Sequence, residues 1–145
     1  MADMLHEIII NSAASNVYDA ITTETGLKCW WTADAITQAE QGSVATFGFG
    51  GRATVFRMRI ERLEKDKTVH WHCLGDADEW EGTDLKFDIE PTGQHQSVLH
   101  FRHAHWRSTE GWFAMSNTTW GAVIVRLKEF VEGRSSQPYF DGLGQ

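Results

Sequence analysis

The sequence predicts an α+β domain in which a curved antiparallel β-sheet wraps around one long C-terminal helix. Three observations support this fold class. An opening run of isoleucines precedes two short helical patterns, the middle of the chain alternates apolar and polar residues, and the last third spaces its apolar residues by three and four. Alternation is typical of half-buried strands, and spacings of three and four are typical of an amphipathic helix.

The first part of the chain is expected to form one strand and two short helices. Residues 5–11 carry three consecutive isoleucines, and β-branched side chains favour a strand. The small polar residues at 12–15 can cap a helix over residues 17–21, where apolar positions are three and four apart. Gly26 interrupts this pattern, and residues 27–31 are expected to form a second short helix or turn.

The middle of the chain is expected to be an antiparallel meander of five or six strands. Each predicted strand places apolar side chains on one face and polar side chains on the other. Their ranges are 43–49, 53–63, 69–73, 83–90 and 98–104. Such a sheet has one apolar face, which another layer of the structure must cover.

The last periodic segment, from about residue 109 to residue 132, is expected to be one amphipathic helix that supplies this layer. Ser108 is the expected N-cap, and Gly133 is the residue expected just past the end. We therefore expect a single domain over residues 1–138 and a short C-terminal tail over residues 139–145.

Composition and charge exclude several classes of partner. The 145 residues fit one domain, and the formal net charge is −7 without any block of lysine and arginine. Nucleic acid and anionic membrane surfaces attract clustered positive charge, so neither is an expected partner. Cys29 and Cys73 lie far apart in the sequence, and the N-terminus has no long apolar run. These features predict a cytoplasmic protein.

The predicted architecture leaves an apolar pocket between the helix and the sheet. One helix cannot fill the concave face of a strongly curved sheet, and the remaining space suits a hydrophobic small molecule. Seven tryptophans and eight phenylalanines are more large rings than a small core readily packs. The residues expected to line the pocket are Trp30, Trp31, Phe49, Phe56, Met58, Trp71, Trp80, Phe87, His103, Trp112 and Met115. Trp120 is a further candidate, and for any single tryptophan ordinary core packing is the alternative.

Histidines suggest two other kinds of chemistry. His70 and His72 point the same way on a strand, and with a histidine of the later strand they could begin a metal site. The interpretation we adopt is that they lie exposed on the polar face with no metal bound, because spacing fixes no third ligand. His103 shares a face with apolar residues, and it is expected either at the pocket mouth or as a satisfied core histidine.

No catalytic motif is found in the sequence. Neither G-x-S-x-G nor H-E-x-x-H occurs, and the glycine-rich run 48–51 lacks a lysine and a following helix. We therefore name no catalytic residue and no cofactor, and we expect a binding protein. The alternative is an enzyme acting on a bound apolar substrate, with His103 or a pocket acid as general base.

Several motifs, in their order along the chain, carry a resemblance to a known family. They are residues 13–21 followed by Trp30 and Trp31, residues 59–63 leading to 69–71, residues 80–83 leading into 85–90, residues 103–106, and Trp120 with residues 127–133. Over residues 5–138 the chain resembles the START-like superfamily, also called SRPBCC or Bet v 1-like. More narrowly, it is similar to the branch called activator of Hsp90 ATPase homologue-like.

This resemblance implies a helix-grip fold that encloses a site for hydrophobic ligands. It also implies an alternative role as a co-chaperone-like domain whose partner is an Hsp90-type chaperone ATPase. An exposed sheet edge or apolar patch would be compatible with a homodimer. Function is carried by a site and not by a fold, so these implications are expectations.

Overall fold

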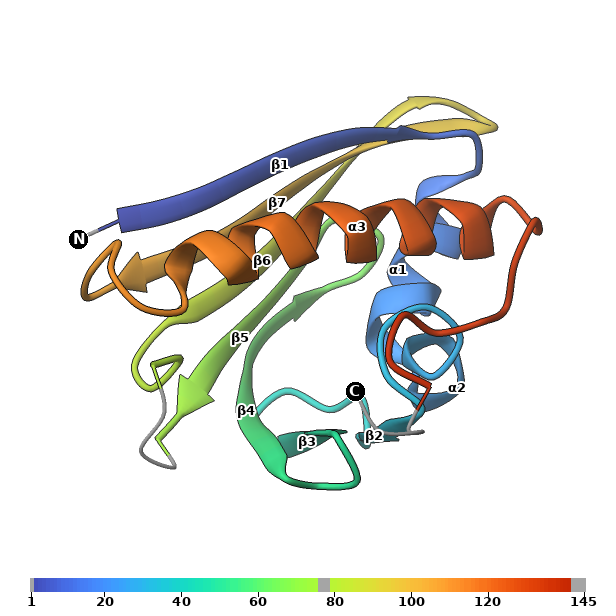
Figure 1. Ribbon diagram of the computed structural model, residues 1–145. Coiled ribbons are helices and arrows are strands. Elements are labelled where there is room, and N and C mark those ends of the chain that lie inside the picture. The colour runs from blue at the N-terminus through green and yellow to red at the C-terminus, as the bar shows by residue number, and fades with distance from the viewer. Residues whose placement is uncertain (1, 76–78, 142–145) are drawn as a thin grey trace.

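The computed structural model describes residues 2–75 and 79–141 of the chain (Figure 1). In chain order the elements are β1 (Ala2–Ile10), α1 (Ala14–Thr22), α2 (Glu24–Leu27), β2 (Asp34–Ile36), β3 (Val44–Phe49), β4 (Thr54–Glu64), β5 (Thr68–Leu74), β6 (Asp84–Gly93), β7 (Gln96–Trp106) and α3 (Phe113–Val131). The predicted order of one strand, two short helices, several strands and one long helix is confirmed.

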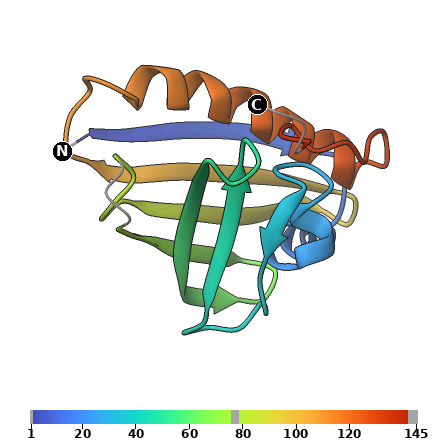
Figure 2. The same ribbon diagram turned by 60° about the horizontal axis from the view of Figure 1, so that its bottom comes forward.

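The strands described form one antiparallel sheet of seven, in the order β1-β7-β6-β5-β4-β3-β2. The sheet curves strongly, α3 runs along its concave side near β1, and α1 and α2 close one end (Figures 1 and 2). This is the helix-grip arrangement that the sequence predicted.

Alternation along the strands decides which side chains enter the core. In β6, Leu85, Phe87 and Ile89 are buried, while Lys86 and Asp88 between them face the outer side. The pattern arises because successive side chains of a strand point to opposite faces of the sheet.

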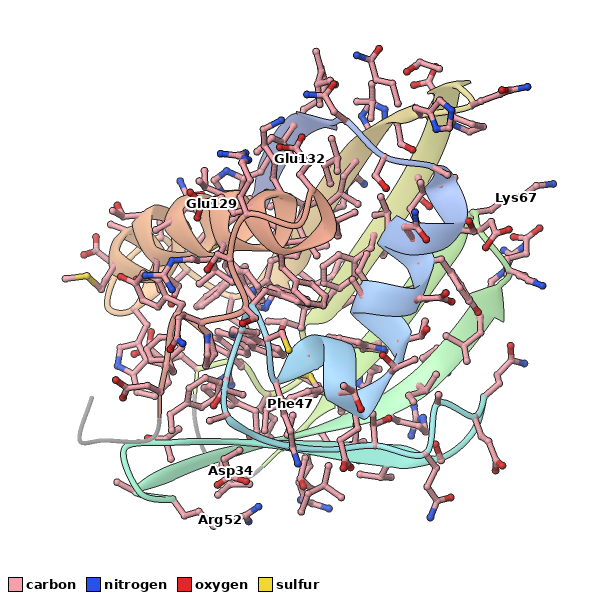
Figure 3. All side chains as sticks on the ribbon, turned by 90° about the vertical axis from the view of Figure 1, so that its right-hand side faces the viewer. Asp34, Phe47, Arg52, Lys67, Glu129 and Glu132 are labelled. Atoms are coloured by element: carbon pink, nitrogen blue, oxygen red, sulfur yellow. The ribbon has the colours of Figure 1, made fainter. Side chains whose placement is uncertain are left out.

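The strand β2 is a short edge strand that the periodicity did not predict. It pairs Asp34 with Gly48 of β3, and a Cβ at Gly48 would collide with the Asp34 carboxylate. The same carboxylate accepts a hydrogen bond of 2.8 Å from Arg52 in the β3–β4 turn, as the labelled side chains of Figure 3 show. Three residues are too few for a period-two signal, which explains why this strand was missed.

The helix boundaries differ from the predicted ones at two places. Gly26 lies inside α2, because the hydroxyl of Thr23 accepts a hydrogen bond of 3.0 Å from its backbone N–H and caps the helix. The long helix starts at Phe113, four residues later than predicted, because Gly111 takes a left-handed conformation with φ of 70°. Ser108 therefore caps a turn, where its Oγ accepts from the N–H of Glu110.

The C-terminal end of α3 is fixed to β1. Gly133 follows the helix with φ of 79°, as predicted for the residue that ends it. Glu132, labelled in Figure 3, accepts hydrogen bonds from Lys128 and from the backbone N–H of Asn11. Lys128 also donates to the carbonyl of Ile9 at 2.6 Å. These contacts tie the helix to the first strand.

The chain after α3 folds back onto the domain. The backbone N–H groups of Tyr139 and Phe140 donate to the carbonyls of Trp30 and Trp31, and Phe140 forms a parallel bridge with Thr32. The first two residues of the predicted tail are therefore packed on the domain, and residues 142–145 of that tail lie outside the described residues. The proposed division at residue 138 stays a prediction.

Candidate functional site

An apolar cavity of about 400 Å³ lies beside the first half of α3. Its walls come from α3, from β3 and β4, from the segment before β6, and from the chain that follows α3. The lining residues are Trp31, Phe49, Thr54, Phe56, Trp80, Trp112, Met115, Ser116, Thr119, Trp120, Val123 and Phe140. Cavities of this size and apolar character are typical sites for small molecules.

Packed aromatic rings make the cavity wall stiff. Phe56 and Trp80 stack face to face, with ring centroids 4.0 Å apart and an interplanar angle of 3°. Trp120 continues this wall at 5.8 Å from Trp80. Phe49 lies 5.5 Å from Phe56 and meets Phe140 edge to face at 4.9 Å. A wall of packed rings presents flat apolar faces, which favour flat apolar ligands.

Three lining residues, Thr54, Ser116 and Thr119, carry hydroxyl groups, and the tryptophans carry indole N–H groups. Among the described lining residues none carries a charge. The cavity can therefore offer hydrogen bonds to a neutral ligand, but it offers no ionic partner to a charged one. Burying an unpaired charge there would be costly, so the site selects against charged groups.

Six of the predicted pocket residues line this cavity, namely Trp31, Phe49, Phe56, Trp80, Trp112 and Met115. The other five, Trp30, Met58, Trp71, Phe87 and His103, lie in the core away from it and are at most 2% exposed. They do not line this cavity, because alternation gives the face of a strand but not the position of a cavity along it, and their role in ligand binding stays a prediction. At the end of the sheet that α1 closes, this helix packs on β5, β6 and β7.

Several lining residues were not among the predicted set. On α3 the lining positions are 112, 115, 116, 119, 120 and 123, which follow the three-and-four spacing of one helical face. Extending the predicted face from Trp112 and Met115 would have found Ser116, Thr119 and Val123. Phe140 had no such signal, because its position depends on the fold-back of the chain after α3.

The buried His103 holds α3 to the sheet behind the cavity. Its Nδ1 accepts from the indole N–H of Trp120 at 3.1 Å, and its Nε2–H donates to the hydroxyl of Thr83 at 2.8 Å. That hydroxyl donates in turn to the carbonyl of Trp80 at 2.6 Å, which assigns the proton of the imidazole to Nε2. Both ring nitrogens are therefore engaged.

Burial lowers the pKa of His103 from 6.5 to about 3, although the nearby Asp84 opposes this shift. The imidazole is thus neutral at physiological pH, and its side chain is fully buried. A neutral ring with both nitrogens occupied cannot take a proton from a ligand in the cavity. The structure therefore places His103 as a satisfied core histidine, the second of the two predicted roles.

On the outer face of the sheet, three histidines surround one carboxylate. Oδ1 of Asp84 accepts from Nε2 of His70 at 2.9 Å and from Nδ1 of His72 at 3.0 Å, and Oδ2 accepts from Nδ1 of His105 at 2.6 Å. Burial alone would raise the pKa of Asp84, but these hydrogen bonds outweigh it and lower the pKa from 3.8 to about 2. Within residues 2–75 and 79–141, no group of three or more His, Cys, Asp or Glu side chains is placed to hold a metal ion.

Most of the tryptophans form one connected network around the cavity and the core. The ring centroids of Trp31 lie 6.1 Å from Trp30, 6.2 Å from Trp71 and 5.3 Å from Trp120. Trp80 lies 5.8 Å from Trp120 and 6.4 Å from Trp106. Cavity-lining and fully buried indoles therefore belong to the same packed cluster.

The curved antiparallel sheet, the long C-terminal helix and the apolar cavity beside it define a helix-grip domain. Residues 11–132 match the family described as activator of Hsp90 ATPase homolog 1-like protein, so the chain belongs to that family. No functionally curated protein matches this sequence significantly. Of the helices that the structure describes, none is both long and apolar enough to cross a membrane.

Solved structures support the same assignment. The solution structure of the Aha1 dimer from Colwellia psychrerythraea is 32% identical, with a TM-score of 0.83 over 92% of this chain and 98% of that chain. A protein from Mesorhizobium loti shares the fold at 13% identity, with a TM-score of 0.79 over 90% of this chain and 97% of its own. CalU16 from Micromonospora echinospora shares it at 14% identity, with a TM-score of 0.73 over 91% and 75% of the two chains.

Proposed function

We propose that this domain binds a small, neutral, hydrophobic molecule with a flat aromatic part in the cavity beside α3. The observation that carries the proposal is a cavity of about 400 Å³ with aromatic walls, three hydroxyls and no charged lining residue among those described. The fold is one that binds hydrophobic ligands in its superfamily, which supports the same function. Cys29 and Cys73 are not joined in a disulfide, which fits the expectation of a cytoplasmic protein.

The proposal is tested with a panel of neutral aromatic compounds, by thermal melting and tryptophan fluorescence. A ligand at a hundredfold excess over its Kd adds about 2.7 kcal/mol of stability. For a chain of this length that raises Tm by roughly 8 °C. Because Trp31, Trp80 and Trp120 line the cavity, the same ligand should change the tryptophan emission.

A matched pair of variants on α3 makes the test specific. Thr119→Phe adds a ring on the lining face, so it should fill part of the cavity and weaken ligand binding by tenfold or more. Thr118→Phe adds the same ring to the neighbouring exposed residue, and it should leave binding unchanged. Equal affinities in the two variants would show that the ligand binds elsewhere, and no response to any compound would refute the proposal.

We further propose that the chain forms a homodimer. The support is its likeness to the Colwellia psychrerythraea protein, whose solved structure is a dimer and whose sequence is 32% identical. A role with an Hsp90-type ATPase is supported by the family description alone. It is tested by adding the domain to a purified chaperone, where an unchanged ATPase rate and no pull-down would remove it.

A further inference from the structure

The rim of the cavity exposes large apolar side chains. Met115 is 71% exposed and Trp112 is 41% exposed, and both also line the cavity. Leaving these side chains in water next to an apolar recess forgoes the free energy of their burial. The same face therefore carries a projecting apolar group and a hollow that can receive one.

This combination is what a two-fold symmetric contact requires. In such an interface the same patch of each copy meets the other, so a projection and its receptor must lie on one face. Methionine suits the projecting role, because its flexible thioether side chain adapts to irregular apolar surfaces. A face with a hollow but no projection would need a different partner.

Charge favours this face for contact between two copies. Each copy carries a formal net charge of −7, so two copies repel each other at long range. The described residues that line the cavity carry no charge, so a contact centred on its mouth has no charged side chain at its centre. The carboxylate of Glu79, which accepts from the backbone N–H of Trp112 at 3.0 Å, is not one of these lining residues. Like-charged groups at the centre of an interface would instead oppose association.

The exposed apolar side chains of β1 lack one of these features. On β1, Leu5 is 64% exposed and Ile9 is 53% exposed, but Glu7 lies between them. A two-fold contact through this strand would bring the two Glu7 carboxylates close together. Lys128 also occupies the carbonyl of Ile9 at 2.6 Å, which hinders pairing with a further strand.

We propose that a second copy of this chain docks on the cavity mouth, with Met115 and Trp112 of each copy packed into the mouth of the other. The proposal rests on the homodimer proposed above and names its surface. Because the docked side chains enter the space that a ligand would fill, ligand binding and self-association compete. The dimer then keeps the apolar site covered until a ligand replaces the partner's side chains.

Sedimentation velocity over a concentration series tests the surface with one matched pair of variants. Met115→Glu places a carboxylate at the centre of the proposed contact in both copies, and it should raise the dimer Kd about a hundredfold or more. Leu5→Glu makes the same change of charge at an equally exposed residue of β1, and its dimer Kd should stay within about threefold. A monomeric wild-type protein, or a dimer lost in Leu5→Glu and kept in Met115→Glu, would overturn the proposal.

A neutral apolar dye, Nile red, tests the competition and separates it from the ligand proposal. Saturating dye should lower the dimer fraction of the wild-type protein, and the dye should bind wild-type protein more tightly below the dimer Kd, where the protein is monomeric, than well above it. Equal binding to dimer and monomer would refute the competition. If neither form binds the dye or any panel compound, the ligand proposal fails, while the sedimentation result still decides the dimer surface.

Discussion

Replacing Asp84 by asparagine tests how much one carboxylate contributes on the outer face of the sheet. Asp84 is nearly buried, and it accepts hydrogen bonds from His70, His72 and His105 at 2.9, 3.0 and 2.6 Å. An asparagine has one acceptor oxygen in place of two and turns two N–H donors toward the imidazoles. The variant should therefore lose most of the hydrogen bonding to the three histidines without creating a cavity.

The magnitude follows from the pKa of Asp84, which is lowered from 3.8 to about 2. For a fully buried group this change would correspond to about 2.5 kcal/mol of stability at neutral pH. The histidine side chains are 24%, 31% and 51% exposed, so water screens part of the interaction. We therefore expect Asp84→Asn to lower the free energy of unfolding by about 1–2 kcal/mol at pH 7.

The pH dependence has a definite sign. The pKa of Asp84 is lower in the folded state, so its contribution is present above about pH 4 and is lost as the pH falls toward 2. Urea unfolding of wild type and Asp84→Asn should thus show a difference at pH 7 that shrinks between pH 4 and pH 2.

The neighbouring Asp88→Asn is the control for this experiment. Asp88 lies on the same strand and face but is exposed, with one hydrogen bond from Thr68 at 3.0 Å. Its replacement should change stability by no more than about 0.5 kcal/mol. An Asp84→Asn variant as stable as wild type at pH 7, or a difference independent of pH, would refute the reasoning.

The remaining predictions concern Phe140 of the cavity wall and the buried His103 behind it. His103→Leu leaves the buried indole N–H of Trp120 without an acceptor and removes the donor to the Thr83 hydroxyl, and urea unfolding should show a loss of about 2–4 kcal/mol. Because the pKa of His103 is lower in the folded state, its contribution to the free energy of unfolding of the wild type should decrease as the pH falls below 6.5. The variant should not show this His103-dependent loss of stability. Phe140→Ala removes a half-buried wall of the cavity, so melting should show a loss of about 1–2 kcal/mol and titration about tenfold weaker Nile red binding. Unchanged stability in the first variant, or unchanged dye affinity in the second, would contradict these assignments.

The longer strands and the long helix could be predicted because a buried face spaces its apolar residues by two in a strand and by three or four in a helix. The alternation of Leu85, Phe87 and Ile89 identified β6 and its buried face, and the three-and-four spacing identified α3. The start of α3 could not be placed in this way, because the left-handed backbone of Gly111 interrupts a helical pattern that continues on both sides. Such a residue changes the chain direction without changing the periodicity.

The candidate site was predictable in kind but only partly in its residues. Side chains of Phe56 and Met58 share one face of β4, yet Phe56 lines the cavity and Met58 is sealed in the core. What separates them is where the cavity lies along β4, which is a tertiary property that alternation does not give. The contribution of Phe140 depends on contacts between distant parts of the chain, and local sequence carries no signal for it.

The tryptophan network has an optical consequence. Six indoles are linked by ring-centroid distances between 5.3 and 6.4 Å. Trp30 and Trp71 each neighbour Trp31, Trp31 neighbours Trp120, and Trp80 connects Trp120 to Trp106. At such separations excitation passes readily from one indole to the next, so the cluster emits as a coupled set. A molecule that quenches Trp31, Trp80 or Trp120 in the cavity would therefore also reduce the fluorescence excited at the buried Trp30, Trp71 and Trp106. The total tryptophan emission would then report whether this one cavity is occupied.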